Sequence, residues 1–311
     1  MAYQLKAEPI PEGIKRIAHE RLHNAIQELE GAAEDSQGEA VHKARKRLKE
    51  LRAVVRLVRE PLGQEVYQRE NICFRDAGRR LSDVRDAQVL LDTLEKLVEH
   101  FAESVEPGAF EEVRGVLKEH SESIRQTVLE NGNDVSLALN SLKKAQRRVD
   151  DWTLKDDWAA LSPGLKRIYQ QGYQNFHHAS KEPTAENLHE WRKRVKDMWY
   201  HTLILQPIWA GMMTELAEQL HQLSDDLGDD HDLAVLHQFI SDRAQQFQDQ
   251  AELNILTALI EQRRLQLQRH AKLLGRRIYA EKAKRFIKRN TAYWKAWRSE
   301  VSNSLVFEAI P

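Results

Sequence analysis

The residues best suited to chemistry in this sequence are cations gathered in one short segment. Residues 41–59 ("VHKARKRLKELRAVVRLVR") hold eight Lys or Arg residues and a single acid, Glu50, although the formal net charge of the whole chain is -1. Placed on a helix at about 100° per residue, the segment predicts one apolar face and an adjoining stripe without acids. This first basic stripe consists of His42, Arg45, Lys46, Lys49, Arg52 and Arg56.

The first basic stripe has two interpretations, a solvated helix face and an anion-binding surface. Solvated faces usually alternate charges, because opposite charges at i,i+4 attract each other. In this stripe like charges follow one another at i,i+3 and i,i+4, which is unfavourable unless an anion neutralises them. We therefore expect the stripe to bind an anion.

The same pattern recurs in the second half of the chain. "LHEWRKRVK" (188–196) matches "VHKARKRLK" (41–49), with the histidine and four of the cations at the same positions. The second basic stripe consists of His189, Arg192, Lys193 and Lys196. It then becomes aromatic and apolar, since Trp199 and Leu203 stand where the first stripe has Arg52 and Arg56. We expect the two stripes to contribute unequally to anion binding.

The paired histidines, His42 and His189, favour anion binding over metal or nucleophilic chemistry. Cations follow each histidine at i+3 and i+7, where a metal site would need carboxylate, imidazole or thiolate. No serine or cysteine accompanies both histidines, so the pattern does not support a catalytic triad. Beside cations an imidazole tends to stay neutral and can donate an N–H to a phosphate oxygen. We expect both histidines to bind the anion or to orient their stripe.

An acidic motif, "DDLGDDHD" (225–232), is the strongest indication of an enzyme. A DDxxD pattern on a helix can hold Mg²⁺ against a diphosphate, as in all-α prenyl diphosphate synthases. Those enzymes need two such motifs, and the matching segment "RRLSDVRD" (79–86) has arginines in place of the first two aspartates. We therefore favour a role in capping helices or holding basic side chains, with a Mg²⁺-dependent enzyme as an alternative.

Two further groups of cations are candidates for the same anion site. The segment 275–289 has seven basic residues and one acid, and four of its cations fall within one helical sector. These four, the C-terminal basic cluster, are Lys282, Arg285, Lys288 and Arg289. Arg79 and Arg80 add two cations one helix after the first basic stripe.

The composition predicts an all-α protein that positions these residues on helices. Of 311 residues, only 13 are Gly and 8 are Pro, while 41% are hydrophobic and 31% are charged. The single cysteine, Cys73, rules out an internal disulfide and suits a reducing compartment. The N-terminal sequence lacks a signal-peptide core, and no apolar run approaches the ~20 residues of a membrane span. We expect a cytoplasmic protein without a membrane segment.

The helices are organised as an internal duplication. Four pairs of segments match in order at offsets of 151, 147, 146 and 146 residues. They are "GIKRI" (13–17) with "GLKRI" (164–168), the two basic stripes, Pro61 with Pro207, and "LSDVRDAQVL" (81–90) with "LGDDHDLAVL" (227–236). The repeat predicts two similar antiparallel helical bundles in tandem, a first copy over 1–150 and a second copy over 151–311.

Three features together resemble the CHAD family, the conserved histidine α-helical domain. They are the duplicated H-x-x-R-K/R-x-x-K helix, the L-[SG]-x-x-[RH]-D segment and the ending "GRRIYAEKAKRFIKRNTAYWKAWR". The resemblance covers essentially the whole chain and implies two four-helix bundles around a pseudo-two-fold axis. It also implies a basic central groove or pore that binds inorganic polyphosphate, with ligands from both basic stripes and the C-terminal basic cluster.

The resemblance also implies a binding module without a catalytic centre or cofactor. Some family members carry a triphosphate-tunnel (CYTH) domain, but its E-x-E-x-K signature is absent here, so we expect the stand-alone type. The expected partner is long-chain polyphosphate, with association to polyphosphate granules as a further possibility. The alternative is single-stranded nucleic acid, which is less favoured because no aromatic residues interleave with the first basic stripe to stack bases.

Overall fold

The computed structural model of the chain is all-α, as the sequence predicts. It describes residues 3–31, 37–81, 83–106, 108–130 and 134–308, without side chains for 37, 83–86, 125–130 and 303–308, and within these ranges no strand occurs. The helices of the first copy are α1 (Ile10–Glu30), α2 (Gln37–Leu57), α3 (Arg59–Arg80), α4 (Asp83–His100), α5 (Glu111–Glu130) and α6 (Asp134–Arg148). Those of the second copy are η2 (Trp158–Ala160), α7 (Ser162–Lys181), α8 (Ala185–Ile204), η3 (Gln206–Trp209), α9 (Ala210–Asp242), η4 (Ala244–Gln246), α10 (Gln250–Ile278) and α11 (Ala283–Glu308).

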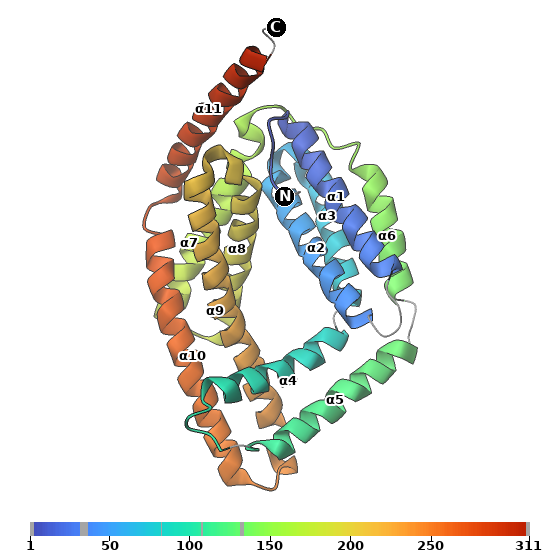
Figure 1. Cartoon of the computed structure of the whole chain (residues 1–311), viewed down its shortest axis with the longest axis vertical. Coiled ribbons are helices and arrows are strands. Elements are labelled where there is room, and N and C mark those ends of the chain that lie inside the picture. Colours follow the sequence, from blue (N-terminus) through green and yellow to red (C-terminus); the bar gives the residue numbers. More distant parts are fainter. Residues whose placement is uncertain (1–2, 32–36, 82, 107, 131–133, 309–311) are drawn as a thin grey trace.

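Two four-helix bundles stand side by side in the upper part of the molecule (Figure 1). In the first bundle α1, α2, α3 and α6 pack in a closed ring, and in the second bundle α7, α8, α9 and α10 do the same. The bundles meet where α2 contacts α7 and α8. Helix α11 packs on α7 and η3 at the outer side of the second bundle, and its last turns extend beyond that bundle (Figure 1).

A third packing unit closes the lower part of the molecule. Helices α4 and α5 leave the first bundle and cross to the lower halves of α9 and α10 (Figure 1). There they share a separate hydrophobic core, to which α4 contributes Leu94, α5 contributes Leu117, α9 contributes Leu236 and α10 contributes Leu256. This crossing brings the start of α4 opposite α2, α8 and α9.

The order of the helices is consistent with the predicted duplication. Helices α1 and α2 stand in the first bundle as α7 and α8 do in the second, and each copy continues with a short turn that contains a proline, Pro61 or Pro207. In the first copy this turn forms the beginning of α3. A kink at Gly63, whose positive φ of 77° favours glycine, separates it from the rest of that helix. The copies then differ, because α9 runs unbroken over 33 residues where the first copy has the separate helices α3 and α4.

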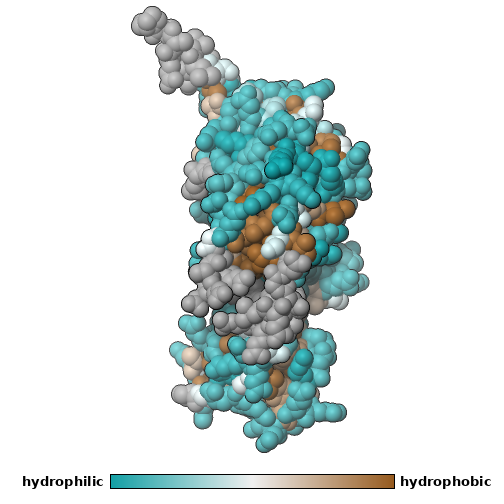
Figure 2. Space-filling view, turned by 90° about the vertical axis from the view of Figure 1, so that its right-hand side faces the viewer, coloured by the Kyte–Doolittle hydropathy of each residue, from teal (hydrophilic) through white to brown (hydrophobic). Residues whose placement is uncertain are grey.

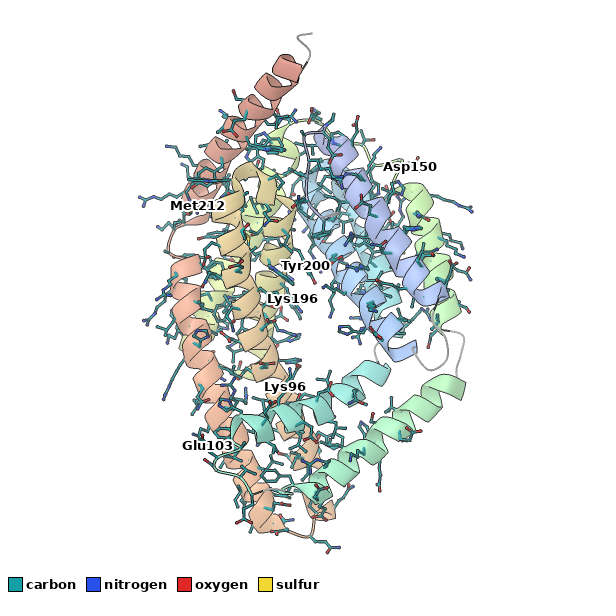
Figure 3. The ribbon with its side chains drawn as sticks, viewed as in Figure 1. Lys96, Glu103, Asp150, Lys196, Tyr200 and Met212 are labelled. Atoms are coloured by element: carbon teal, nitrogen blue, oxygen red, sulfur yellow. The ribbon has the colours of Figure 1, made fainter. Side chains whose placement is uncertain are left out.

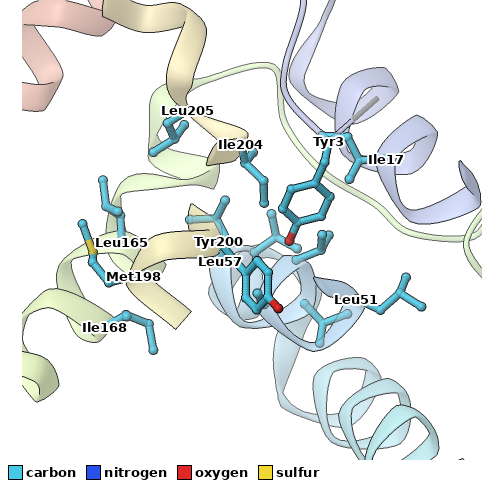
Figure 4. Packing of buried hydrophobic residues seen from close by; sticks show 14 of the residues in the cluster. Tyr3, Ile17, Leu51, Leu57, Leu165, Ile168, Met198, Tyr200, Ile204 and Leu205 are labelled. Carbon is cyan, nitrogen blue, oxygen red and sulfur yellow. The ribbon is translucent and has the colours of Figure 1, made fainter. Parts of the chain in front are cut away.

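The two copies share one core at the upper end of the molecule. The predicted division between residues 150 and 151 lies in the connection from α6 to α7, and the larger hydrophobic cluster continues across it. Leu51 and Leu57 of α2 belong to the same cluster as Leu165 of α7 and Met198 of α8 (Figure 4). The backbones approach so closely that a Cβ at Gly164 would collide with the Leu57 carbonyl. The bundles are therefore joined by a core rather than linked by a flexible segment.

Helix α2 shows why the bundles join at this end. Its predicted apolar face is buried, with Ala44, Leu48, Leu51, Val55 and Val58 each at most 1% exposed. After Glu50 the opposite face becomes apolar as well, because Ala53, Val54 and Leu57 are also fully buried. Apart from Arg52 and Arg56, this half of α2 is apolar on every side and must be covered by other helices. The second half of α2 is therefore the part that α7 and α8 enclose.

Polar links across the same contact fix the position of α2 relative to α8. The Arg56 guanidinium lies 2.5 Å from the carboxylate of Asp197, which is 5% exposed and also lies 3.2 Å from Arg194. Nearby, His201 Nε2 donates to the Ala53 carbonyl oxygen at 2.9 Å, and burial lowers the pKa of His201 to about 4, so its imidazole is neutral. These contacts join the two helices that carry the basic stripes.

The helices turn their polar sides to the outer surface of the molecule. Seen from the α6 side, the surface is mostly hydrophilic, with hydrophobic residues gathered midway along it (Figure 2). Among the described residues, no helix combines the length and the apolar character needed to cross a membrane.

Replacing Asp197 by Asn should destabilise the fold, because it leaves Arg56 and Arg194 in a mostly buried site without a counter-charge. We expect the free energy of unfolding to fall by about 3 kcal/mol, as in other buried ion pairs that lose one partner. Guanidinium chloride unfolding followed by circular dichroism measures this change. The matched control is Glu39→Gln, which removes an exposed carboxylate 2.7 Å from Lys43 and should leave the midpoint unchanged. Equal midpoints for the two variants would show that the Arg56–Asp197 contact does not hold the bundles together.

Candidate functional site

A cleft of ≈ 530 Å³ lies between the two bundles, below the contact of α2 with α8. We call it the central cleft; Figure 3 shows Lys196 and Tyr200 on the face of α8 that is turned toward it. Its walls are parts of α2, α4, α8 and α9. The lining residues are His42, Arg45, Lys46, Lys49, Val89, Leu90, Arg192, Lys196, Trp199, Tyr200, His221, Asp225, His231, Asp232 and Val235. The central cleft therefore combines residues from both basic stripes, as the duplication predicts.

The α2 wall carries the first four members of the first basic stripe. His42, Lys46 and Lys49 are exposed, and Arg45 is half-buried. They project into the central cleft because the apolar face of α2, from Ala44 to Val58, packs into the first bundle. The helical period then places the stripe on the side that faces α8.

The α8 wall carries two cations, Arg192 and Lys196, and both are half-buried. Burial, with the nearby Arg192 and Lys46, lowers the pKa of Lys196 to about 8, against the opposing effects of Asp225 and Asp232. The Arg192 guanidinium lies over Gly228 of α9, where a Cβ would stand 3.1 Å from it. Among the described residues no acceptor binds the buried Arg192 Nε. Protein groups thus do not fully neutralise Arg192 and Lys196. Such incompletely neutralised cations favour the binding of an anionic ligand.

The two histidines predicted as a pair occupy different positions. His42 lines the central cleft, whereas His189 lies behind His231, with ring centroids 4.3 Å apart. Burial, then His231 and the neighbouring cations, lowers the pKa of His189 to about 4, so this imidazole is neutral near pH 7. His189 can orient His231, which itself lines the central cleft. His189 does not line the central cleft itself, and its predicted role in binding the anion or orienting the second basic stripe stays a prediction.

The last two members of the first basic stripe do not line the central cleft. Arg56 is held by Asp197, and Arg52 Nε donates to Asn71 Oδ1 at 3.2 Å. Burial and the charge of Arg56 lower the pKa of Arg52 to about 10. Both lie on the half of α2 that the second bundle encloses, so the cleft ends before it reaches them.

The remaining predicted cations also lie outside the central cleft. Lys193 is exposed and pairs with Glu190 at 2.5 Å, and Arg80 pairs with Asp134 at 3.1 Å. Arg79 is exposed at the end of α3. The C-terminal basic cluster lies on and just before α11, at the outer side of the second bundle, where Arg289 Nε donates to Glu281 at 3.0 Å. A contribution of these residues to anion binding stays a prediction.

The acidic motif of α9 divides between two faces of the helix. Asp226 and Asp230 are buried against α10, where Asp226 binds His270 Nδ1 at 2.6 Å and Asp230 accepts from Arg264 Nε at 3.1 Å. Asp225 and Asp232 instead line the central cleft. Within the described ranges, no group of three or more metal-ligating side chains occurs. Asp226 and Asp230 thus hold basic side chains of α10. The interpretation of capping or holding applies to Asp229 and Asp232 and to their counterparts in the first copy, Asp83 and Asp86. Asp229 lies 3.8 Å from Lys96, and Asp83 and Asp86 lie outside the described side chains.

Sequence reasoning did not assign several lining residues to the anion site, although Asp225, His231 and Asp232 lie in the acidic motif that it singled out. The unassigned residues are Val89, Leu90, Tyr200, His221, Asp225, His231, Asp232 and Val235, together with Trp199, which was noted only as a departure from the first stripe. One signal was available for His231, because the repeat aligns it with Arg85, a cation in the matching segment. The apolar residues gave no such signal, since a Val or Leu on an amphipathic helix is normally part of the core.

Comparisons with known proteins agree with this architecture. The family model described as the CHAD domain matches residues 16–241. Among solved structures, the crystal structure of the CHAD domain from the plant Ricinus communis is similar in fold, with a TM-score of 0.64 and 17% sequence identity. The similarity covers 86% of this chain and 90% of that chain. No curated protein matched the sequence. Because the family model matches well over half of the residues of this chain, the chain belongs to the CHAD domain family.

Proposed function

We propose that the protein binds inorganic polyphosphate in the central cleft without transforming it. The observation that carries this proposal is the convergence of Arg45, Lys46 and Lys49 of α2 with Arg192 and Lys196 of α8 on one cleft. Charge-assisted hydrogen bonds from Arg and Lys to phosphate oxygens are each worth about 1.5–3 kcal/mol gross. A long polyanion that engages several of them at once also releases counterions, so its affinity should fall steeply with salt.

The side chains around the central cleft support binding better than catalysis. The aspartates that could have held Mg²⁺ face in two directions, and two of them already bind His270 and Arg264. The free thiol, Cys73, does not line the cleft. We accordingly propose that the acids of α9 hold other side chains in place and shape the cleft. We also propose a cytoplasmic role, with polyphosphate or polyphosphate granules as the partner.

Charge reversal on both walls should abolish polyphosphate binding. The variant Arg45→Glu/Arg192→Glu replaces two attractions with two repulsions, so we expect the Kd for long-chain polyphosphate to rise at least about 100-fold. Isothermal titration calorimetry at fixed salt measures the Kd, with orthophosphate as a weakly bound reference. The matched control is Lys166→Glu/Lys181→Glu, which changes the net charge equally on exposed positions of α7 and should change the Kd less than threefold.

Two further experiments distinguish this proposal from the alternatives. Lys282→Glu/Arg285→Glu tests whether the C-terminal basic cluster takes part, since both residues are exposed and remote from the central cleft. Competition with single-stranded RNA tests the nucleic-acid alternative. Normal polyphosphate binding by Arg45→Glu/Arg192→Glu would contradict the proposal, and displacement of polyphosphate by equimolar RNA would favour nucleic acid as the ligand.

Polyphosphate affinity should fall with rising pH above about 8. The pKa of Lys196 is about 8 in the free protein, so the cation is present below that pH and is lost above it. Because only the charged form attracts phosphate, the affinity should decline by up to about tenfold per pH unit between pH 8 and 9.5. Lys196→Arg keeps the charge throughout this range and should flatten the profile.

The matched control for this profile is Lys193→Arg, because Lys193 is exposed, paired with Glu190 and outside the central cleft. It should retain the pH dependence of the unmodified protein. A steep decline in Lys196→Arg would show that another group controls binding.

A further inference from the structure

The central cleft has a second kind of wall that a bare polyphosphate does not use. Beside the cations it is lined by five apolar or aromatic residues. They are Val89 and Leu90 of α4, Trp199 and Tyr200 of α8, and Val235 of α9. Leu90 and Tyr200 are buried, Val89 and Trp199 are half-buried, and Val235 is exposed. Polyphosphate has no apolar part, and the open apolar surface of Val235 and Trp199 beside water is unfavourable. The composition of the cleft therefore fits a ligand that carries phosphates at one end and an apolar, planar group at the other.

Trp199 is the residue best placed to receive a planar group. It is half-buried, its ring stacks on Tyr200 at 4.9 Å with an interplanar angle of 29°, and His221 meets it edge-on at 4.4 Å. These neighbours fix the orientation of the indole before any ligand binds. Val235, a further lining residue, is 44% exposed although it is large and hydrophobic. A preordered aromatic ring beside open apolar surface is typical of stacking sites for bases.

Asp225 adds a polar feature that phosphate alone would disfavour. Its carboxylate lines the central cleft, is about half exposed (53%) and lies 2.9 Å from His221 Nδ1. A carboxylate repels phosphate oxygens but accepts hydrogen bonds from hydroxyl and amino groups. Asp225 belongs to the same His221–Trp199 group of side chains, so donors on the planar end of a ligand would find an acceptor there.

We propose that the central cleft binds nucleoside polyphosphates as well as inorganic chains. The phosphates contact the cations of α2 and α8, the base packs on Trp199, and Asp225 accepts from sugar hydroxyl or base amino groups. This inference rests on the proposed function, because the same cations hold the phosphates in both cases. The cleft volume of ≈ 530 Å³ lies within the about 300–1,000 Å³ that small-molecule sites occupy.

The decisive comparison is ATP against inorganic tripolyphosphate, both without divalent cations and at the same ionic strength. The two ligands have three phosphates each, but tripolyphosphate carries more negative charge and no nucleoside. A site that recognises charge alone binds tripolyphosphate at least as tightly as ATP. If the nucleoside contacts Trp199, ATP should instead bind about tenfold more tightly by calorimetry.

Two variants assign the preference to the named side chains. Trp199→Leu keeps apolar volume but removes the flat ring, so the ratio of ATP affinity to tripolyphosphate affinity should fall from about ten to one or below. The matched control is Trp209→Leu, because Trp209 is 48% exposed on η3 and remote from the central cleft. It should leave the ratio near ten. Circular dichroism and thermal unfolding establish that each variant is folded.

Asp225→Asn is the second variant, and its exposed side chain makes misfolding a minor concern. Loss of the charge relieves repulsion of tripolyphosphate, so affinity for that ligand should rise while the ATP preference shrinks. A ratio that neither Trp199→Leu nor Asp225→Asn changes would overturn the inference, as would equal or tighter binding of tripolyphosphate by the unmodified protein. In the latter case polyphosphate binding stands, whereas failure of long-chain polyphosphate, tripolyphosphate and ATP to bind would overturn both proposals.

Discussion

The contact between α2 and α8 is the constraint on which the rest of the structure depends. Both helices carry cations on the sides that face the central cleft, so bringing them together opposes their mutual repulsion. A buried apolar core and the Arg56–Asp197 ion pair hold them together at the upper end. Below that point the cationic faces remain apart and enclose the central cleft. One continuous stripe on α2 thus divides into a structural half and a ligand-facing half.

Two cations of the cleft, Arg192 and Lys196, are held in a state that the free protein does not fully neutralise. Arg192 lies over Gly228 with its Nε buried, and burial lowers the pKa of Lys196. Such groups reduce the stability of the folded chain, and they persist because the surrounding core stabilises the bundle more than they destabilise it. The third packing unit contributes here, since α4 and α5 anchor the lower halves of α9 and α10 and keep the cleft walls at a fixed distance.

Periodicity and repetition made the helices, the duplication, the buried face of α2 and six residues of the central cleft predictable from the sequence. The ion pair of Arg56 was not predictable, because its partner Asp197 lies 141 residues away in the sequence. The repeat does hold a partial signal, since Asp197 occupies the position of Glu50. Both acids are buried, and each pairs with an arginine three residues earlier, Arg47 or Arg194. The lone acid of the first segment is thus a core residue, but only the tertiary structure shows that Asp197 also binds an arginine of the other copy.

The central cleft, like the whole chain, contains both positive and negative side chains. Asp225 and Asp232 stand on the α9 wall, while Arg45, Lys46 and Lys196 stand on the α2 and α8 walls. Because positive and negative groups occupy different walls, the potential changes across the cleft instead of being uniformly positive. A uniformly charged chain can use only the α2 and α8 side, which leaves Trp199, Val235 and Asp225 without a role. A ligand with one anionic end and one planar, hydrogen-bond-donating end would match both sides.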